Sequence, residues 1–269
     1  MSLKKKLFTV GLMLPVLALK ADIIWPSDND WNPVWVGTQY YYDDLGDQNP
    51  ESVDLIGSGA NSAGYWLKLE NGFVNGSETD DAFMFRIRLR GAGSSGTGGQ
   101  NVWQVHMDTD GNANNVEWIL QLVQSGNQSG QGVILIQTAV GGSTLGEVDT
   151  GSNTASWQGS KAGFSRWNTA PGGTNAFVDL AIPWTEFSTI TGVSAVEQLR
   201  VIISTSTSHA NITKDAPLGA TLSDQISNVL SENIPEPTVV SLMLGAGGGL
   251  ILFHRLRKRA ANGEGGQAS

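Results

Sequence analysis

The sequence predicts an all-β protein, an antiparallel β-sandwich or jelly roll with an N-terminal signal peptide and a single C-terminal transmembrane helix. Glycine is abundant, at 34 residues, and only 15% of residues are charged, a composition that suits short strands joined by tight turns. Apolar and polar residues alternate over short stretches, as expected for strands with one buried face. With 269 residues the chain is long enough to bury a large core.

The clearest strand is predicted over 81–90, DAFMFRIRLR, because every second residue is apolar. These residues share one face: Phe83, Phe85, Ile87 and Leu89. The glycine-rich stretch that follows, 91–99, predicts a loop. The same alternation predicts eight further strands, in chain order 34–42, 53–56, 65–69, 101–108, 116–123, 133–140, 176–182 and 199–207.

Helix is expected only in short pieces. Pro183 begins a helical turn over 183–187, because proline is favoured at the first position of a helix. Residues 223–232 are either a second helical turn or part of a linker. We therefore divide the chain into a signal peptide (1–21), a β-sandwich domain (22–215), a linker (216–233), a sorting signal with a membrane helix (234–259) and a disordered cytoplasmic tail (260–269).

Charge is distributed unevenly along the chain. Residues 22–234 hold 8 basic and 23 acidic residues, a net charge of about −15, although the whole chain carries −9. A body this acidic argues against binding to nucleic acid, which needs a positive surface. The chain has no cysteine, which excludes thiolate catalysis and cysteine-ligated zinc.

The N-terminus has the layout of a secretory signal peptide. Three lysines at 4–6 precede an apolar stretch over 7–19, and small residues follow it. This stretch is short for a membrane span, and Pro15 interrupts it. Cleavage is expected after Ala18 or Ala21, so the protein is predicted to be exported across the inner membrane.

The C-terminus carries an uncharged run over 239–253 followed by a basic cluster. As a helix the run spans about 22 Å, against ~30 Å for the hydrocarbon core, a gap that snorkelling basic side chains can close. The basic cluster acts as a membrane stop that stays in the cytoplasm, and it consists of Arg255, Arg257, Lys258 and Arg259.

Pro235, Glu236 and Pro237 lie directly before this run. The triplet, the short glycine-containing apolar helix and the basic cluster together resemble the PEP-CTERM sorting signal of Gram-negative bacteria. The resemblance implies that an exosortase-type transpeptidase cuts near the triplet after a transient stay in the inner membrane. It also implies release or transfer to the cell envelope or the extracellular space, often where exopolysaccharide is made. Residues 260–269 extend beyond the usual end of such a signal.

Three stretches of the body resemble the carbohydrate-binding family 9 and DOMON-like sandwiches. They are DDAFMFRIRL, the pair WQVHMDTDGN and VEWILQL, and NAFVDLAIPWTEF. The resemblance supports the sandwich fold and carries no ligand residue across to this chain.

One loop is a candidate calcium site, and calcium is the only cofactor that the sequence suggests. Asp108, Asp110 and Asn112 have the spacing that begins an EF-hand loop, but the later glycine and glutamate fall at other positions. A hairpin turn needs the same residue types, so both readings stay open. Asp43, Asp44 and Asp47 form a second acidic loop with a weaker claim.

Trp25, Trp31 and Trp35 cluster near the mature N-terminus and are candidates for a sugar-binding platform. The sequence contains neither a G-x-S-x-G nor an H-E-x-x-H motif, and no carboxylate pair stands out as catalytic. We therefore expect a non-catalytic protein of the envelope or extracellular matrix with a structural or adhesive role. The alternative is a polysaccharide-binding module, assisted by calcium.

Overall fold

The structure, a computed structural model, describes residues 22–73, 81–91, 101–123, 132–138, 143–146, 155–169 and 175–234. The expected signal peptide, the Pro235–Pro237 triplet, the apolar run, the basic cluster and the expected C-terminal tail lie outside these residues. Within the described ranges no helix is both long enough and apolar enough to cross a bilayer.

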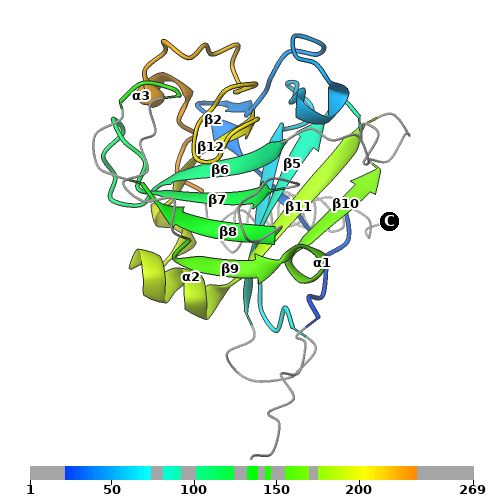
Figure 1. The fold of residues 1–269 in the computed structure, drawn as a ribbon, viewed down its shortest axis with the longest axis vertical. Coiled ribbons are helices and arrows are strands. Elements are labelled where there is room, and N and C mark those ends of the chain that lie inside the picture. The colour runs from blue at the N-terminus through cyan, green and yellow to red at the C-terminus, as the bar shows by residue number, and fades with distance from the viewer. Residues whose placement is uncertain are drawn as a thin grey trace, which may run out of the picture.

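Two five-stranded sheets and one two-stranded sheet make up the fold, and every strand pair is antiparallel (Figure 1). The first sheet has the order β1 (Asn32–Pro33), β4 (Gly64–Leu69), β5 (Ala82–Leu89), β11 (Ala176–Pro183), β10 (Ser165–Thr169). The second has the order β12 (Arg200–Ser206), β6 (Val102–Asp108), β7 (Trp118–Val123), β8 (Gly132–Gln137), β9 (Trp157–Ser160). The all-β prediction is confirmed.

Within the described residues, helices are few and short. The helices are η1 (Glu51–Val53), α1 (Lys161–Phe164), α2 (Trp184–Thr191), η2 (Val196–Gln198) and α3 (Ile226–Val229). The expected turn after Pro183 is confirmed as α2, for which Pro183 is the N-cap and Gly192 the left-handed C-cap.

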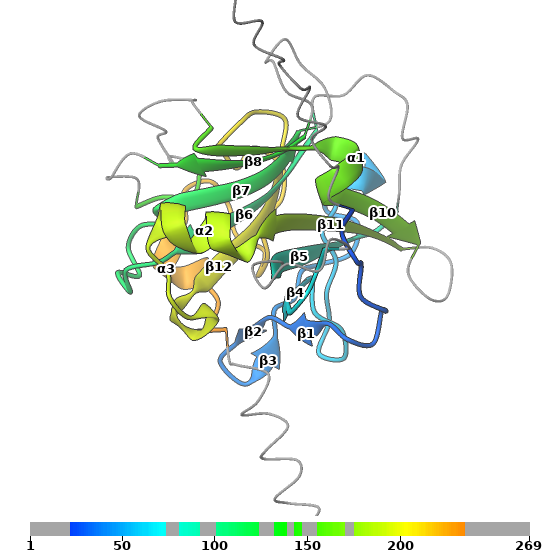
Figure 2. The ribbon, with the colours of Figure 1, turned by 90° about the horizontal axis from the view of Figure 1, so that it is seen from below.

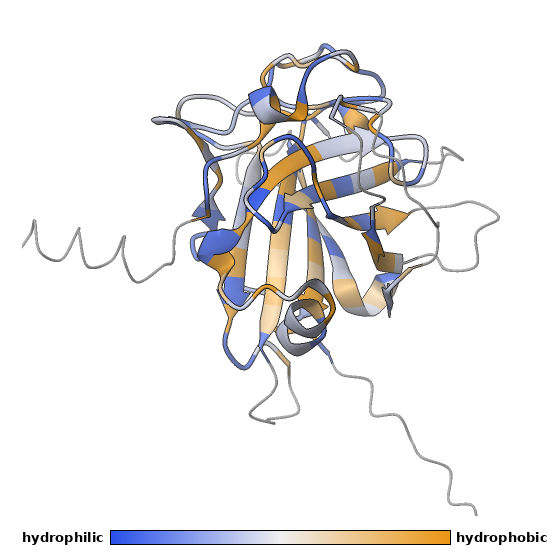
Figure 3. Cartoon of the chain, turned by 90° about the vertical axis from the view of Figure 1, so that its left-hand side faces the viewer, coloured by the Kyte–Doolittle hydropathy of each residue, from blue (hydrophilic) through white to orange (hydrophobic). Residues whose placement is uncertain are grey.

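The main core lies between the two large sheets, which form two layers in Figure 2. Both sheets contribute their alternate apolar residues to it, so orange and blue bands alternate along the strands in Figure 3. Phe83, Phe85 and Ile87 of β5 face Trp103 and the other inward residues of β6 in the same cluster. The predicted inward face of 81–90 is therefore confirmed.

The outer faces of both sheets are also covered, which alternation alone does not predict. Every residue of β6 and of β7 is buried, and so is Arg86 on the outer face of β5. A second cluster covers the outer side of the second sheet and includes Ile119, Ile202, Ile212 and Ile226. Buried polar side chains therefore occur on both outer faces and need partners within the protein.

The C-terminal segment supplies much of this cover. Ala216, Ile226 and Val229 are buried in the second cluster, and Ile234 is buried in the main core. The folded domain therefore extends past 215 to Ile234, and the stretch expected to be a linker is part of the fold. The apolar residues Ile226, Val229 and Leu230 pack in the second cluster with Ile119 of β7 and Ile202 of β12.

Two predicted strands differ in the structure. The stretch 34–42 divides into β2 (Trp35–Val36) and β3 (Gln39–Tyr40), a hairpin turned at Gly37, whose φ of +59° favours glycine. Over 53–56 only Leu55 pairs, in a single bridge to Leu89. Strands β9 and β10 were not predicted, because WQGS and SRWNT show no apolar alternation.

Candidate functional site

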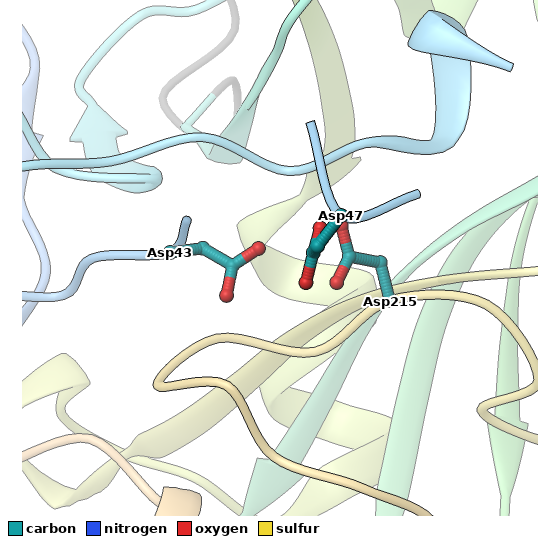
Figure 4. A group of neighbouring side chains, drawn as sticks. All are labelled: Asp43, Asp47 and Asp215. Atoms are coloured by element: carbon teal, nitrogen blue, oxygen red, sulfur yellow. The ribbon is translucent and has the colours of Figure 1, made fainter. Parts of the chain in front are cut away.

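The structure gathers three carboxylates at one end of the fold: Asp43, Asp47 and Asp215 (Figure 4). Asp43 and Asp47 lie in the connection between β3 and η1, and Asp215 lies in the segment after β12. One oxygen from each side chain falls within 4.8 Å of the others. We call this group the Asp43 cluster.

A tight turn carries Asp47 to the cluster. Gly46 has a φ of +88°, a left-handed conformation that glycine adopts without strain. Its N–H donates to the Asp54 carboxylate at 3.1 and 3.3 Å, and Arg90 pairs with that carboxylate at 3.0 Å. A Cβ at position 46 would meet the Arg90 guanidinium at 3.0 Å. The glycine therefore allows the 43–47 loop to close over Asp54.

Asp215 is held from both its backbone and its side chain. The Thr205 N–H donates to the Asp215 carbonyl at 2.9 Å, which fixes the segment against β12. The Leu55 N–H donates to Asp215 Oδ2 at 2.7 Å. The Asp43 carbonyl accepts from the Gly57 N–H at 3.1 Å, so Asp43 through its backbone and Asp215 through its side chain are both tied to the 54–57 stretch.

The electrostatics of the Asp43 cluster are unfavourable for three charged groups. Asp43 is only 2% exposed, and neither of its carboxylate oxygens has a hydrogen-bond partner in the described part of the protein. Burial, with the charges of Asp215 and Asp47 beside it, raises the pKa of Asp43 to about 9. Burial, with Asp47 and Asp54 nearby, raises the pKa of Asp215 to about 7. The group therefore favours taking up protons or a cation.

The Asp108 loop is arranged differently. Asp108 is fully buried; its Oδ1 accepts from the Gly111 N–H at 2.8 Å, and its other oxygen pairs with Arg200. Glu117 accepts from the Thr109 N–H at 2.7 Å. The Asn112 backbone N–H donates to the Asp110 carboxylate at 2.8 Å. One carboxylate oxygen of Glu117 lies within 4.8 Å of an oxygen of Asp108 and an oxygen of Asp110. Backbone N–H groups of the loop and the Arg200 guanidinium thus already bind the carboxylates of Asp108 and Glu117, which supports the hypothesis of a hairpin turn.

The three tryptophans of the expected platform are engaged in packing. Trp31 is 7% exposed and lies against the Arg86 guanidinium, whose carbon is 4.4 Å from the ring centre. Trp25 is half-buried beside Arg166 at 4.9 Å. Trp35 is half-buried, and its ring centre is 4.4 Å from that of Tyr40. Each ring thus already has a partner within the fold.

Two of the three members of the Asp43 cluster, Asp43 and Asp47, lie in the acidic loop with the weaker sequence-based claim to calcium. The spacing of Asp43 and Asp47 indicated an acidic loop, whereas Asp215 is an isolated aspartate far along the chain. Only the pairing of the 213–215 segment with Thr205 brings it to the loop. No local pattern carried that signal.

Comparisons of the chain with protein-family models, with curated proteins and with solved structures found no match. The residues and their geometry alone therefore carry the functional argument.

The raised pKa of Asp43 predicts how stability changes with pH when divalent cations are removed. The unfolded chain loses the Asp43 proton near its ordinary pKa of 3.8, whereas the folded state holds it up to about 9. Stability should therefore fall as pH rises between these values, since the charged form must face Asp47 and Asp215. Melting in EDTA from pH 5 to 8 should show a clearly smaller decline for Asp43→Asn than for the natural chain.

Asp44→Asn is the matched control, because Asp44 is the exposed neighbour in the same loop. Its melting curves should follow those of the natural chain at each pH. Equal declines for Asp43→Asn and the natural chain would contradict the raised pKa.

Proposed function

We propose that the chain is an exported, non-catalytic β-sandwich of the cell envelope or extracellular matrix, with a structural or adhesive role. We further propose that an exosortase-type transpeptidase processes it at Pro235, Glu236 and Pro237. One observation supports the proposal: the chain is still packed into the main core at Ile234, and the proline triplet occupies the next three positions of the sequence.

The last described residues are firmly attached to the domain. Ile234 is 1% exposed, and its N–H donates to the Leu199 carbonyl at 2.9 Å. The Ser231 N–H donates to Val201 at 3.0 Å, and the Glu232 N–H donates to Trp35 at 2.8 Å. A cut beyond Ile234 would therefore leave every one of these contacts in place. Proline biases itself and its predecessor toward extended backbone, which a protease can grip at the edge of the fold.

The start of the domain suits removal of a leader. Ile23 pairs with Phe73 in a β-bridge, and the Ile24 N–H donates to the Gly72 carbonyl at 2.7 Å. Cleavage after Ala18 or Ala21 would retain both residues.

The histidines of the described domain support a non-catalytic role. His106 is fully buried, and burial lowers its pKa to about 3, so it stays neutral beside Ser204 at 3.1 Å. His209 is half-buried and bonded to Gln121 at 3.0 Å. Both side chains form hydrogen bonds with polar residues on the outer face of the second sheet. A polysaccharide-binding module is the alternative function; the rings expected to form its platform, Trp25, Trp31 and Trp35, each lie against a neighbour in the fold.

Replacement of Pro235, Glu236 and Pro237 by alanine tests the sorting proposal. In the native host, the variant should remain in the membrane fraction at a higher apparent mass, because the transpeptidase lacks its recognition site. Immunoblots of fractionated cells measure both properties. The matched control is Asn233→Ala, an exposed residue two positions before the triplet, which should be processed normally. An unchanged mass and location for the triple variant would favour a plain tail anchor.

A further inference from the structure

We propose that Asp43, Asp47 and Asp215 bind one calcium ion, which fastens the 43–47 loop to the segment that follows β12. This site is separate from the Asp108 loop that sequence analysis favoured. It also does not depend on sorting, since all three ligands lie within the folded domain.

The need for a cation begins with Asp43. Its side chain points toward Asp47 and Asp215 in Figure 4, and both of its oxygens are buried without a hydrogen-bond partner. Buried carboxylates in proteins are paired with donors, with opposite charges or with metal ions, because burying an unpaired charge is costly. Asp43 has no ion-pair partner in the described chain, and the Gly219 N–H beside it does not reach hydrogen-bond geometry, whereas two further carboxylates face it.

The nearby arginine is already engaged. Arg90 pairs with Asp54 at 3.0 Å and with Glu51 at 3.3 Å. Across the described residues, no lysine or arginine forms an ion pair with a member of the Asp43 cluster. The other buried acids of the described chain, Asp54, Asp108 and Asp179, each have an arginine partner. The Asp43 cluster thus differs from the rest of the fold in lacking an internal positive charge.

The donor set favours calcium over other metals. All three ligands are carboxylates, with neither imidazole nor thiolate in the group, which suits a hard cation. Calcium–oxygen distances of about 2.3–2.6 Å place opposite ligands about 4.6–5.2 Å apart. Three oxygens within 4.8 Å of one another come within about 2.8 Å of a common point, so a side-chain shift of a few tenths of an ångström would bring all three to calcium. Asp47 is exposed, so the ion and its remaining water ligands have a route from solvent.

Such an ion would join segments that are distant in sequence. The Tyr42 carbonyl accepts from the Leu218 N–H at 3.0 Å, and the Tyr41 hydroxyl donates to the Val229 carbonyl at 2.5 Å. The loop that carries Asp43 is therefore continuous with contacts to the C-terminal cover of the second sheet. Calcium should hold the loop and the cover together and raise the stability of the whole domain.

The test is a calcium titration of the full-length chain in detergent, followed by thermal melting and by terbium luminescence. Calcium at millimolar concentration should raise the melting temperature by several degrees over EDTA, and magnesium should raise it less, because it prefers a smaller octahedral shell. Terbium should give sensitised emission that calcium displaces, since Tyr41 and Tyr42 adjoin Asp43.

Variants separate this site from the other acidic loop. Asp43→Asn and Asp215→Asn should abolish the calcium-induced rise in melting temperature. Asp47→Asn, an exposed change that leaves the core intact, should lower the apparent affinity for calcium at least tenfold. Asp44→Asn and Asp110→Asn should keep the full shift. The proposal is overturned if calcium produces no shift and terbium no emission, as expected if protons alone neutralise the cluster. A shift lost in Asp110→Asn and kept in Asp43→Asn would also overturn it.

Discussion

Replacement of Asp179 by asparagine is expected to lower the free energy of unfolding by about 3–5 kcal/mol, because it removes one partner of a buried ion pair. Asp179 is fully buried on the outer face of β11, where Arg86 binds it through two nitrogens at 2.7 and 2.9 Å. Arg166 adds a third bond at 2.9 Å. The Arg86 side chain is itself only 2% exposed, so it would stay buried with much of its charge uncompensated.

Urea denaturation of the natural chain and the variant measures this loss. The matched control is Asp28→Asn, which removes the other carboxylate on Arg86, at 2.7 Å. The Asp28 side chain is 40% exposed, so its loss should cost about 1 kcal/mol or less. Similar losses for the two variants would show that the buried pair adds nothing beyond a surface one.

Replacement of Trp103 by alanine is expected to cost about 3–5 kcal/mol, because it opens a large cavity between the sheets. The Trp103 ring is fully buried and lies edge-on to Trp167, with 4.8 Å between ring centres. Its Nε1 donates to the Ser52 carbonyl at 2.7 Å, so the change also leaves that buried oxygen unpaired. The residue thus joins the second sheet to η1 and to β10.

Denaturation measured by near-UV circular dichroism tests this loss. Trp35→Ala is the matched control, since Trp35 is half-buried on the β2–β3 hairpin and contacts Tyr40. It should cost clearly less than Trp103→Ala. Equal losses would contradict the assignment of Trp103 to the main core and of Trp35 to the periphery.

Local patterns predicted the elements that have a strong period. The alternation in 81–90, 101–108 and 116–123 predicted β5, β6 and β7, and the residues of 81–90 predicted to share one face lie in the main core. Pro183 likewise predicted the helical turn with which α2 begins, although it is the N-cap of the helix and not its first residue. Such features are local, since a strand period or a helix cap involves residues only a few positions apart.

Other features depended on contacts between distant residues. Alternation indicates which residues share a face, and it does not indicate whether a second layer covers the polar face. The outer side of β5 therefore looked suited to solvent, whereas Arg86 is buried there against Asp179. In the same way, 216–233 has the composition of a linker, and only its contacts with β12 make it part of the domain.

The acidic loops illustrate the division most clearly. The amino-acid order alone established the all-β class, the inner faces of the main strands and the two loops rich in carboxylates. The tertiary structure decided which loop lacks an internal positive charge: Arg200 reaches Asp108, while Arg90 is held by Asp54 and leaves Asp43 with Asp47 and Asp215. The reason is physical, because the charge of a carboxylate is set by neighbours in space, and most of those neighbours lie far away in the chain.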